Sequence, residues 1–327
     1  MLRGAGVPLG SRMRNGSRRE AVFLAAFIAM TVLLAGCAQE DQPAPSRYDR
    51  IPATAVKMTP VTDQNPPKSL SPEYLDPVPI AIIDTAGAED SAFILPDGDT
   101  LYRFFTPDVT VPPERQVLDG VTGIWISRKT GGAWSEPERV VLQDKGKLAI
   151  DGCEFVQGDT MWFCSAREGY TGVNWFTAEF KDGRWRDWRP AGFPPEYEVG
   201  ELHIAGDELY YHSSRDGGAG GLDIWVSRKA DGAWSEPENV AAINTPSDEG
   251  WPFMKPDGSE LWFSRDYGLW RSRRVDGEWA APERMIFPLA GEAALDAAGN
   301  VYFTHHYFDG DRMIEADIYF AERVERH

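Results

Sequence analysis

Three near-copies of one phrase constrain the fold of this chain more than any other feature. They occupy residues 124–141, 224–241 and 269–286, and the first two are identical at 13 of 18 positions. Repeats with such a spacing are typical of arrays of small structural units that stack on their neighbours. The chain is therefore expected to have a repeating fold.

Each repeat predicts a small antiparallel sheet of four strands. An acidic residue begins the first strand, a Gly-containing turn leads to a second strand with an aromatic residue, and two further strands follow. Short aromatic and β-branched runs between Gly turns are typical of hairpins. Four-stranded units about every 45–50 residues indicate the blades of a β-propeller. The fourth strands carry an aromatic residue that we expect to pack between neighbouring units: Trp134, Trp185, Trp234 and Trp279.

The last unit lacks a fourth strand, and a matching sequence precedes the first unit. Residues 74–89 align without gaps on residues 234–249, which places Glu89 opposite Glu249 in the alignment. We expect this N-terminal segment to supply the outer strand of the last blade, which closes the ring and removes its open edges. The sequence thus predicts an all-β, five-bladed β-propeller of four-stranded antiparallel blades over residues 72–327.

The repeats resemble a known family. Residues 213–264 contain a Ser-Arg-Asp loop, Asp-Ile-Trp, Trp-Ser-x-Pro, Asn-Thr followed by Glu, and Pro-Asp-Gly. This combination is similar to the WD40-like propeller repeat of TolB-type periplasmic proteins and peptidoglycan-associated lipoproteins. The resemblance implies a non-enzymatic envelope protein that binds other envelope components. The best-known member of that family has six blades, so a ring of five is a departure from it.

The start of the chain has the features of an export signal. Three basic residues (Arg14, Arg18 and Arg19) precede the apolar run 21–34. A charged segment, a short apolar run and small residues before a cleavage point describe a secretory signal peptide. The run is shorter than the roughly 18 residues or more of a spanning helix.

The apolar run ends in Leu34-Ala35-Gly36-Cys37. This motif resembles the bacterial lipobox, in which the Cys is acylated, as with palmitate, and becomes the mature N-terminus. We therefore expect residues 1–36 to be a lipoprotein signal peptide and Cys37 to be the lipidation site. Ala38, rather than Asp, follows the Cys, which favours the outer membrane, facing the periplasm.

Residues 37–71 are expected to form a flexible, Pro-rich tether, because residues 38–79 hold nine of the 24 prolines. Without the signal peptide the chain has 28 basic and 50 acidic residues, a net charge of −22. Such a surface repels phosphate backbones, which argues against a nucleic-acid partner. An acidic body is not attracted to anionic headgroups, so the lipid alone must attach the chain to a membrane.

One face of the predicted ring collects charged residues, because the starts of the inner strands and the loops between second and third strands lie on the same side. A ring of carboxylates there could hold Ca²⁺ through oxygen ligands or provide acid–base chemistry. Each carboxylate could equally cap backbone N–H groups or pair with a nearby Arg. No other metal is expected. The predicted binding face comprises Glu89, Asp90, Asp151, Glu198, Glu201, His212, Glu249, Arg167, Arg215 and Arg265, with Glu292 and His305-His306-Tyr307 as further candidates.

Two pairs of residues are expected to face each other across hairpins. With a two-residue turn at residues 158–159, Cys153 and Cys164 lie directly opposite each other. Outside the cytoplasm they could form a disulfide or remain two buried thiols. Alignment of the repeats gives Glu201 and His212 the same relation, either as a catalytic or ligand-binding dyad or as a structural hydrogen bond.

Two function classes stay open. The first is a lipid-anchored, non-catalytic binding module of the cell envelope, with envelope proteins or glycan or peptidoglycan fragments as partners. The alternative is a carbohydrate-active hydrolase, because furanosidase-type glycoside hydrolases are also five-bladed propellers. That chemistry needs two carboxyl groups about 5–9.5 Å apart. Glu89, Asp151 and Glu198 are the candidate catalytic residues, with Asp90, Glu154 and Glu201 as the respective alternatives. A metal-stabilised structural propeller would use the same carboxylates without turnover.

Overall fold

The computed structural model describes residues 45–324, whose regular structure is almost entirely β. The predicted signal peptide and Cys37 lie outside the described residues. Within residues 45–324, no helix has the length and apolar composition needed to cross a membrane. The short helices in this range are η1 (Arg47–Asp49), α1 (Pro113–Gln116) and η2 (Pro195–Tyr197).

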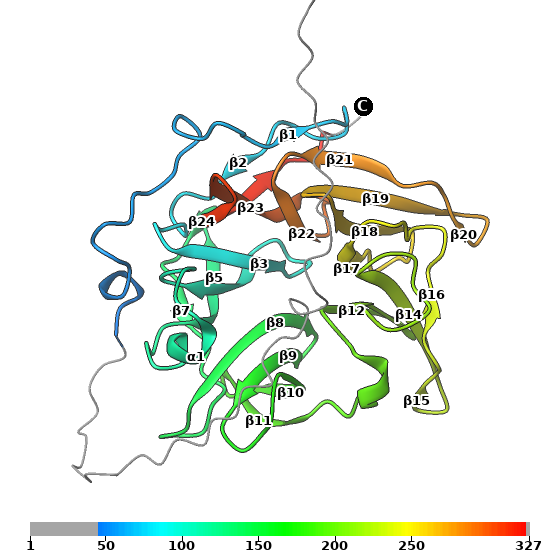
Figure 1. Ribbon diagram of the computed structural model, residues 1–327, viewed down its shortest axis with the longest axis horizontal. Coiled ribbons are helices and arrows are strands. Elements are labelled where there is room, and N and C mark those ends of the chain that lie inside the picture. The colour runs from blue at the N-terminus through cyan, green and yellow to red at the C-terminus, as the bar shows by residue number, and fades with distance from the viewer. Residues whose placement is uncertain (1–44, 325–327) are drawn as a thin grey trace, which may run out of the picture.

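Hydrogen bonding sorts the described strands into four sheets, which are arranged around a common centre (Figure 1). One sheet contains β8 (Ala149–Gln157), β9 (Thr160–Arg167), β10 (Asn174–Lys181) and β11 (Arg184–Pro190). The next contains β12 (Leu202–Ala205), β13 (Glu208–Ser213), β14 (Asp223–Ala230), β15 (Ala233–Trp234) and β16 (Glu238–Asn239). A third contains β17 (Glu249–Met254), β18 (Glu260–Arg265), β19 (Gly268–Val275), β20 (Glu278–Trp279), β21 (Glu283–Phe287) and, at its outer edge, β1 (Lys68–Ser69).

The largest sheet holds two repeat units. One unit is β3 (Ala88–Ile94), β4 (Thr100–Thr106), β5 (Gly123–Thr130), β6 (Ala133–Trp134) and β7 (Glu138–Arg139). The other is β22 (Ala290–Leu295), β23 (Val301–Asp309) and β24 (Arg312–Ala321), with β2 (Val78–Pro79) beside β24. A single parallel bridge between Ala316 and Ala88 joins them. The all-β class and the antiparallel four-stranded units agree with the sequence. The number of blades and the closure of the ring stay predictions, because no sheet among the described residues closes on itself.

The segment before the first unit pairs where the repeat alignment places it. Val78 of β2 lies opposite Phe320 of β24 in antiparallel register, and Tyr74 forms a bridge with Arg323. The N-terminal segment therefore adds strand structure to the outer side of the last unit, some 240 residues away in the chain.

Aromatic residues of the outer strands pack against neighbouring units, as the repeats predict. In four of the five units this ring meets, edge to face, an aromatic residue on the second strand of the preceding unit, with ring centroids 5.8–6.5 Å apart. Trp234 of the remaining unit is partly buried against the main hydrophobic core. Such a pair contributes about 0.5–1.5 kcal/mol beyond the area that it buries. The last of these contacts joins the first unit to the final one. The pairs are Trp185 on Tyr102, Trp279 on Tyr210, Tyr74 on Trp262, and Trp134 on Tyr302.

The N-terminal segment (residues 45–69) also makes buried contacts, which the composition of the predicted tether did not indicate. Arg47 is 3% exposed, and its guanidinium donates to the carboxylate of Glu89 at 2.9 Å. Lys57 forms an ion pair with Asp317 of β24. Residues 45–69 therefore differ from an extended spacer, because Arg47 and Lys57 form ion pairs with buried carboxylates of the sheets.

Candidate functional site: a carboxylate-lined central cavity

The innermost strands share one irregularity. In β3, β8, β17 and β22, the pairing register with the next strand shifts at a β-bulge. A bulge bends the strand and redirects a side chain. A non-Gly residue held at positive φ costs on the order of 1–3 kcal/mol, and such residues concentrate at functional sites. The bulged residues have φ between 51° and 57° and are Ser91, Cys153, Trp251 and Glu292.

These bulges surround a cavity of about 50 Å³. Its walls come from β3, β8, β12, β17 and β22, the strands nearest the centre in Figure 1. A water molecule needs roughly 10–15 Å³ of such space, whereas small-molecule pockets measure about 300–1,000 Å³. The cavity has room for an ion with a few waters and no room for a sugar ring.

Three glutamates line the cavity: Glu154, Glu201 and Glu292. Glu154 is 5% exposed, and within residues 45–324 neither of its carboxylate oxygens has a hydrogen-bond partner. One carboxylate oxygen of Glu292 is likewise buried and unpartnered within that range. Among the described residues, no Lys or Arg forms an ion pair with any of the three.

Burial and mutual repulsion shift the titration of these glutamates. Burial, followed by repulsion from Asp90, raises the pKa of Glu201 to about 8. Burial raises the pKa of Glu292 well above its usual range, and repulsion from Asp90 and Glu201 adds to the effect. The pKa of Glu154 is also raised well above its usual range, by burial and then by repulsion from Glu201. Burial and mutual repulsion therefore favour the protonated, uncharged form of these three glutamates.

A second cluster adjoins the cavity. Oxygen or nitrogen atoms of Asp90, Glu292 and His306 all lie within 4.8 Å of one another. The imidazole Nε2 of His306 is 3.8 Å from a carboxylate oxygen of Asp90. Asp90 and Glu292 come from inner strands, and His306 comes from β23. Glu292 belongs to both the cluster and the cavity wall.

Most predicted carboxylates at the strand starts have structural partners. Asp151 accepts from Arg167 at 2.8 Å and from the hydroxyl of Ser165 at 2.6 Å. Glu249 pairs with Arg265 in the same way. These contacts match the structural alternative for the predicted face, in which each carboxylate pairs with a nearby Arg or caps backbone groups.

Glu89 and Glu249 share a further contact that the repeat alignment explains. The residue four positions earlier, Thr85 or Thr245, donates both its backbone N–H and its hydroxyl to the carboxylate. Both carboxylates are fully buried. The Asn-Thr and Glu of the repeat therefore build a loop cap rather than an open binding position.

Two members of the predicted face lie elsewhere. Glu198 is exposed and follows η2 with a left-handed backbone, φ 49°. It precedes β12 and joins neither the cavity nor the cluster within the described residues. The guanidinium of Arg215 lies over the ring of Trp225, 5.0 Å from its centroid.

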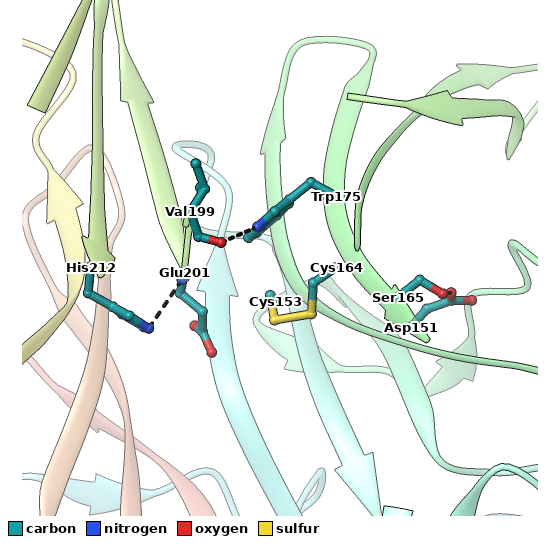
Figure 2. Close-up of a disulfide and its surroundings, with 8 residues drawn as sticks. All are labelled: Asp151, Cys153, Cys164, Ser165, Trp175, Val199, Glu201 and His212. Carbon is teal, nitrogen blue, oxygen red and sulfur yellow. Dashed lines mark hydrogen bonds between the residues drawn. A yellow bond between two sulfur atoms is a disulfide. The ribbon is translucent and has the colours of Figure 1, made fainter. Parts of the chain in front are cut away.

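The cysteines form a disulfide, although their predicted register was wrong by one residue. Cys164 lies opposite Gly152, because Cys153 occupies the bulge. The Cα atoms of the two cysteines are 5.4 Å apart and the sulfur atoms are bonded (Figure 2). The bulge redirects Cys153 toward its partner, so the disulfide forms without direct opposition.

The expected side-chain pair of Glu201 and His212 does not form. In Figure 2 the contact runs from the imidazole Nε2 of His212 to the backbone nitrogen of Glu201, at 3.4 Å, and the carboxylate extends in another direction. The Nδ1 atom of His212 accepts from the backbone of Trp251 at 3.1 Å. Burial lowers the pKa of His212 to about 4. The carboxylate of Glu201 faces the cavity instead.

The sequence predicted a ring of carboxylates that included Asp90, Glu201 and Glu292, but it did not predict the bulges that shape the cavity. A local signal was present, because Gly152, Gly250 and Gly291 each directly precede a bulged residue. A Gly inside a strand pattern often marks a bulge or a close approach. The side chain of Phe104 would lie 3.0 Å from a Cβ at Gly152.

Comparisons with known proteins give fold neighbours only. No family model and no curated protein sequence matches this chain. Structural neighbours include TolB from Agrobacterium tumefaciens, with 16% identity, TM-score 0.41, and 71% of this chain and 74% of that chain covered. A gluconolactonase from Xanthomonas campestris has 12% identity and TM-score 0.43, covering 79% and 95%. An endo-arabinase from Bacteroides thetaiotaomicron has 11% identity and TM-score 0.46, covering 76% and 97%. These neighbours are β-propeller proteins, and likenesses this distant carry no argument about function.

Proposed function

We propose that this protein is a non-catalytic binding module of the bacterial cell envelope, built as a five-bladed β-propeller and attached by a lipid at Cys37. Its partners would be envelope proteins or glycan or peptidoglycan fragments. The N-terminal strand would complete the last blade and close the ring. The lipid-anchored domain would face the periplasm from the outer membrane.

One observation carries the non-catalytic assignment. Of the first three candidate catalytic carboxylates, Glu89 and Asp151 are buried and engaged by Arg47 and Arg167, and Glu198 is exposed on a separate loop. The alternative candidates Asp90, Glu154 and Glu201 lie in or beside the central cavity. Glycoside hydrolysis needs two carboxyl groups that flank a sugar with one of them free to donate a proton. The central cavity, where unpaired carboxyl groups gather, is too small for a sugar ring.

Three observations support a ring of five blades. The innermost strands of five units line one cavity, and aromatic contacts run from four of the outer strands to the preceding unit, including the contact of Trp134 with Tyr302. β2 adds the strand that the last unit lacks. A crystal structure of residues 45–324 would test this arrangement, and a chain in which β2 leaves β24 would contradict it.

Binding and turnover separate the two function classes. We expect the purified protein to bind one class of oligosaccharide or peptidoglycan fragment, or an envelope protein recovered by crosslinking, without product formation. Hydrolysis of any glycan in the panel would overturn the proposal in favour of the hydrolase. As a check on the anchor, cells should incorporate labelled palmitate into the wild-type protein but not into a Cys37→Ser variant.

A further inference from the structure

We propose that the central cavity and its adjoining cluster bind one divalent transition-metal ion, such as Zn²⁺ or Mn²⁺, through Asp90, Glu292 and His306. This site is independent of the proposed binding function, because it needs neither a glycan nor a protein partner. It also differs from the Ca²⁺ expected from the sequence, because one of its three ligands is an imidazole.

The geometry of the three groups suits a small cation. Ligands at about 2.0–2.2 Å from Zn²⁺ in a tetrahedral site lie roughly 3.3 Å from one another. The Asp90 oxygen and the His306 Nε2 are already 3.8 Å apart, and all three ligand atoms lie within 4.8 Å. Small changes of side-chain torsion would bring them to ligand distance.

The positions of the ligands are fixed by the backbone. Ser91 N–H donates to the carboxylate of Asp90 at 2.9 Å, and Ser264 Oγ accepts from the backbone N–H of Glu292 at 2.9 Å. Glu292 is held at φ 57° in the bulge, which turns its side chain toward the centre. Within residues 45–324, the Nδ1 atom of His306 is buried without a hydrogen-bond partner.

A separate observation, an unpartnered buried carboxyl group, points to a ligand in this cavity. Glu154 lines the same cavity as Glu292, is 5% exposed, and neither of its oxygens has a partner among the described residues. A buried ionised carboxylate is costly unless it is paired or coordinates a metal. A divalent cation beside Glu292 would supply a compensating positive charge, and the volume of about 50 Å³ accommodates the ion with bound water.

The other acidic cluster of the molecule shows why the same inference does not apply there. Oxygens of Asp84, Glu89 and Asp317 also lie within 4.8 Å of one another. Arg47 and Lys57 pair with two of these carboxylates, so the chain already provides the cations.

The donor set selects the class of metal. Ca²⁺ and Mg²⁺ prefer sites made wholly of oxygen ligands, whereas imidazole favours Zn²⁺ and its transition-metal neighbours, and carboxylates favour Mn²⁺. Two carboxylates and one imidazole therefore fit a transition-metal ion with one or more water ligands better than Ca²⁺. The ion would hold two inner strands, β3 and β22, and the neighbouring β23 together.

Calorimetry with the full chain, carrying no histidine tag and stripped with EDTA, tests the proposal. ZnCl₂, MnCl₂, CaCl₂ and MgCl₂ are the probes. We expect one Zn²⁺ or Mn²⁺ to bind per chain, and Asp90→Asn, Glu292→Gln and His306→Gln each to weaken that binding at least tenfold. Asp309→Asn, an exposed carboxylate at the end of the same strand as His306, is the matched control and should bind as the wild type does.

Each other outcome overturns the proposal. Absence of saturable one-to-one binding to the wild-type chain would remove the site, and this result needs no variant to fold. Undiminished binding by the folded variants, judged by circular dichroism, would place the ion elsewhere. Tighter binding of Ca²⁺ than of Zn²⁺ and Mn²⁺ would refute the assigned class of metal.

Discussion

Two acidic clusters among residues 45–324 differ in whether basic side chains pair with them. The peripheral cluster (Asp84, Glu89 and Asp317) is buried where the N-terminal segment crosses the sheets, and Arg47 and Lys57 enter it. The central cluster (Asp90, Glu154, Glu201 and Glu292) surrounds the axis, and none of its members pairs with a Lys or Arg among the described residues. The first is therefore part of the folded scaffold, and the second is the cluster that we propose as an ion site.

Acid should destabilise the protein by protonating His203, which lies in the wall of the central cavity. His203 is 6% exposed and packed between the rings of Phe155 and Phe253. Burial lowers its pKa from 6.5 to about 3, so its contribution to stability is complete above pH 6.5 and is lost as pH falls toward 3. That difference corresponds to about 4–5 kcal/mol.

Urea unfolding at several pH values measures this effect. His203→Asn keeps an acceptor for the backbone of Met254 and should be less stable than the wild type at pH 7, with a flatter pH dependence below 6.5. Parallel pH profiles for the two proteins would show that His203 does not resist protonation.

Removal of a cation from the peripheral cluster should lower the free energy of unfolding by almost as much. Arg47→Met leaves the carboxylate of Glu89 buried without its guanidinium partner. Loss of one partner of a buried ion pair costs about 3–5 kcal/mol, so the free energy of unfolding should fall by that amount. Lys181→Met removes a cation from an exposed pair and serves as the control, which should unfold as the wild type does. Equal stability of the two variants would contradict the structural role of the peripheral cluster.

Loss of the disulfide should have a smaller effect. Cys153 and Cys164 are separated by 11 positions, and a loop of that length stabilises by about 2–3 kcal/mol in the chain-entropy model. The double variant Cys153→Ser/Cys164→Ser should unfold at lower denaturant concentration than the oxidised wild type. Wild type treated with a reductant should match the double variant, and a midpoint that does not change on reduction would count against this contribution.

The smallest expected change is a gain in stability, on substitution of Glu154. In EDTA, Glu154→Gln should raise the free energy of unfolding at pH 8 by about 1 kcal/mol, because an unpartnered carboxyl group is replaced by a neutral amide. The matched substitution Glu89→Gln should lower it, because Glu89 has Arg47 and Thr85 as partners. If both substitutions changed stability in the same direction, the distinction between the clusters would fail.

The repeats predicted the structural features that recur from one unit to the next. Alternation of apolar residues and alignment of the repeats predicted the strand order, most of the aromatic contacts and the pairing of residues 74–79 with the last unit. They could do so because the same local sequence meets the same neighbours in each unit. The loop cap formed by Thr245 and Glu249 is of this kind. It recurs at Glu89 because the alignment holds there.

What the sequence did not predict has two physical sources. A bulge adds one residue without changing the pattern of apolar side chains, so the register of Cys153 and the turn of Glu292 toward the axis were not apparent. Arg47 and Lys57 lie outside the repeats, in a Pro-rich stretch with little periodicity, so the repeats do not indicate their partners. Long-range ion pairs of this kind depend on how the ring positions distant residues.

Anomalous diffraction from crystals grown with Zn²⁺ tests the contrast between the two clusters most directly. The account predicts one strong peak between Asp90, Glu292 and His306, with Lys57 still paired to Asp317. A peak among Asp84, Glu89 and Asp317, or no peak at either cluster with Zn²⁺ in excess, would contradict it.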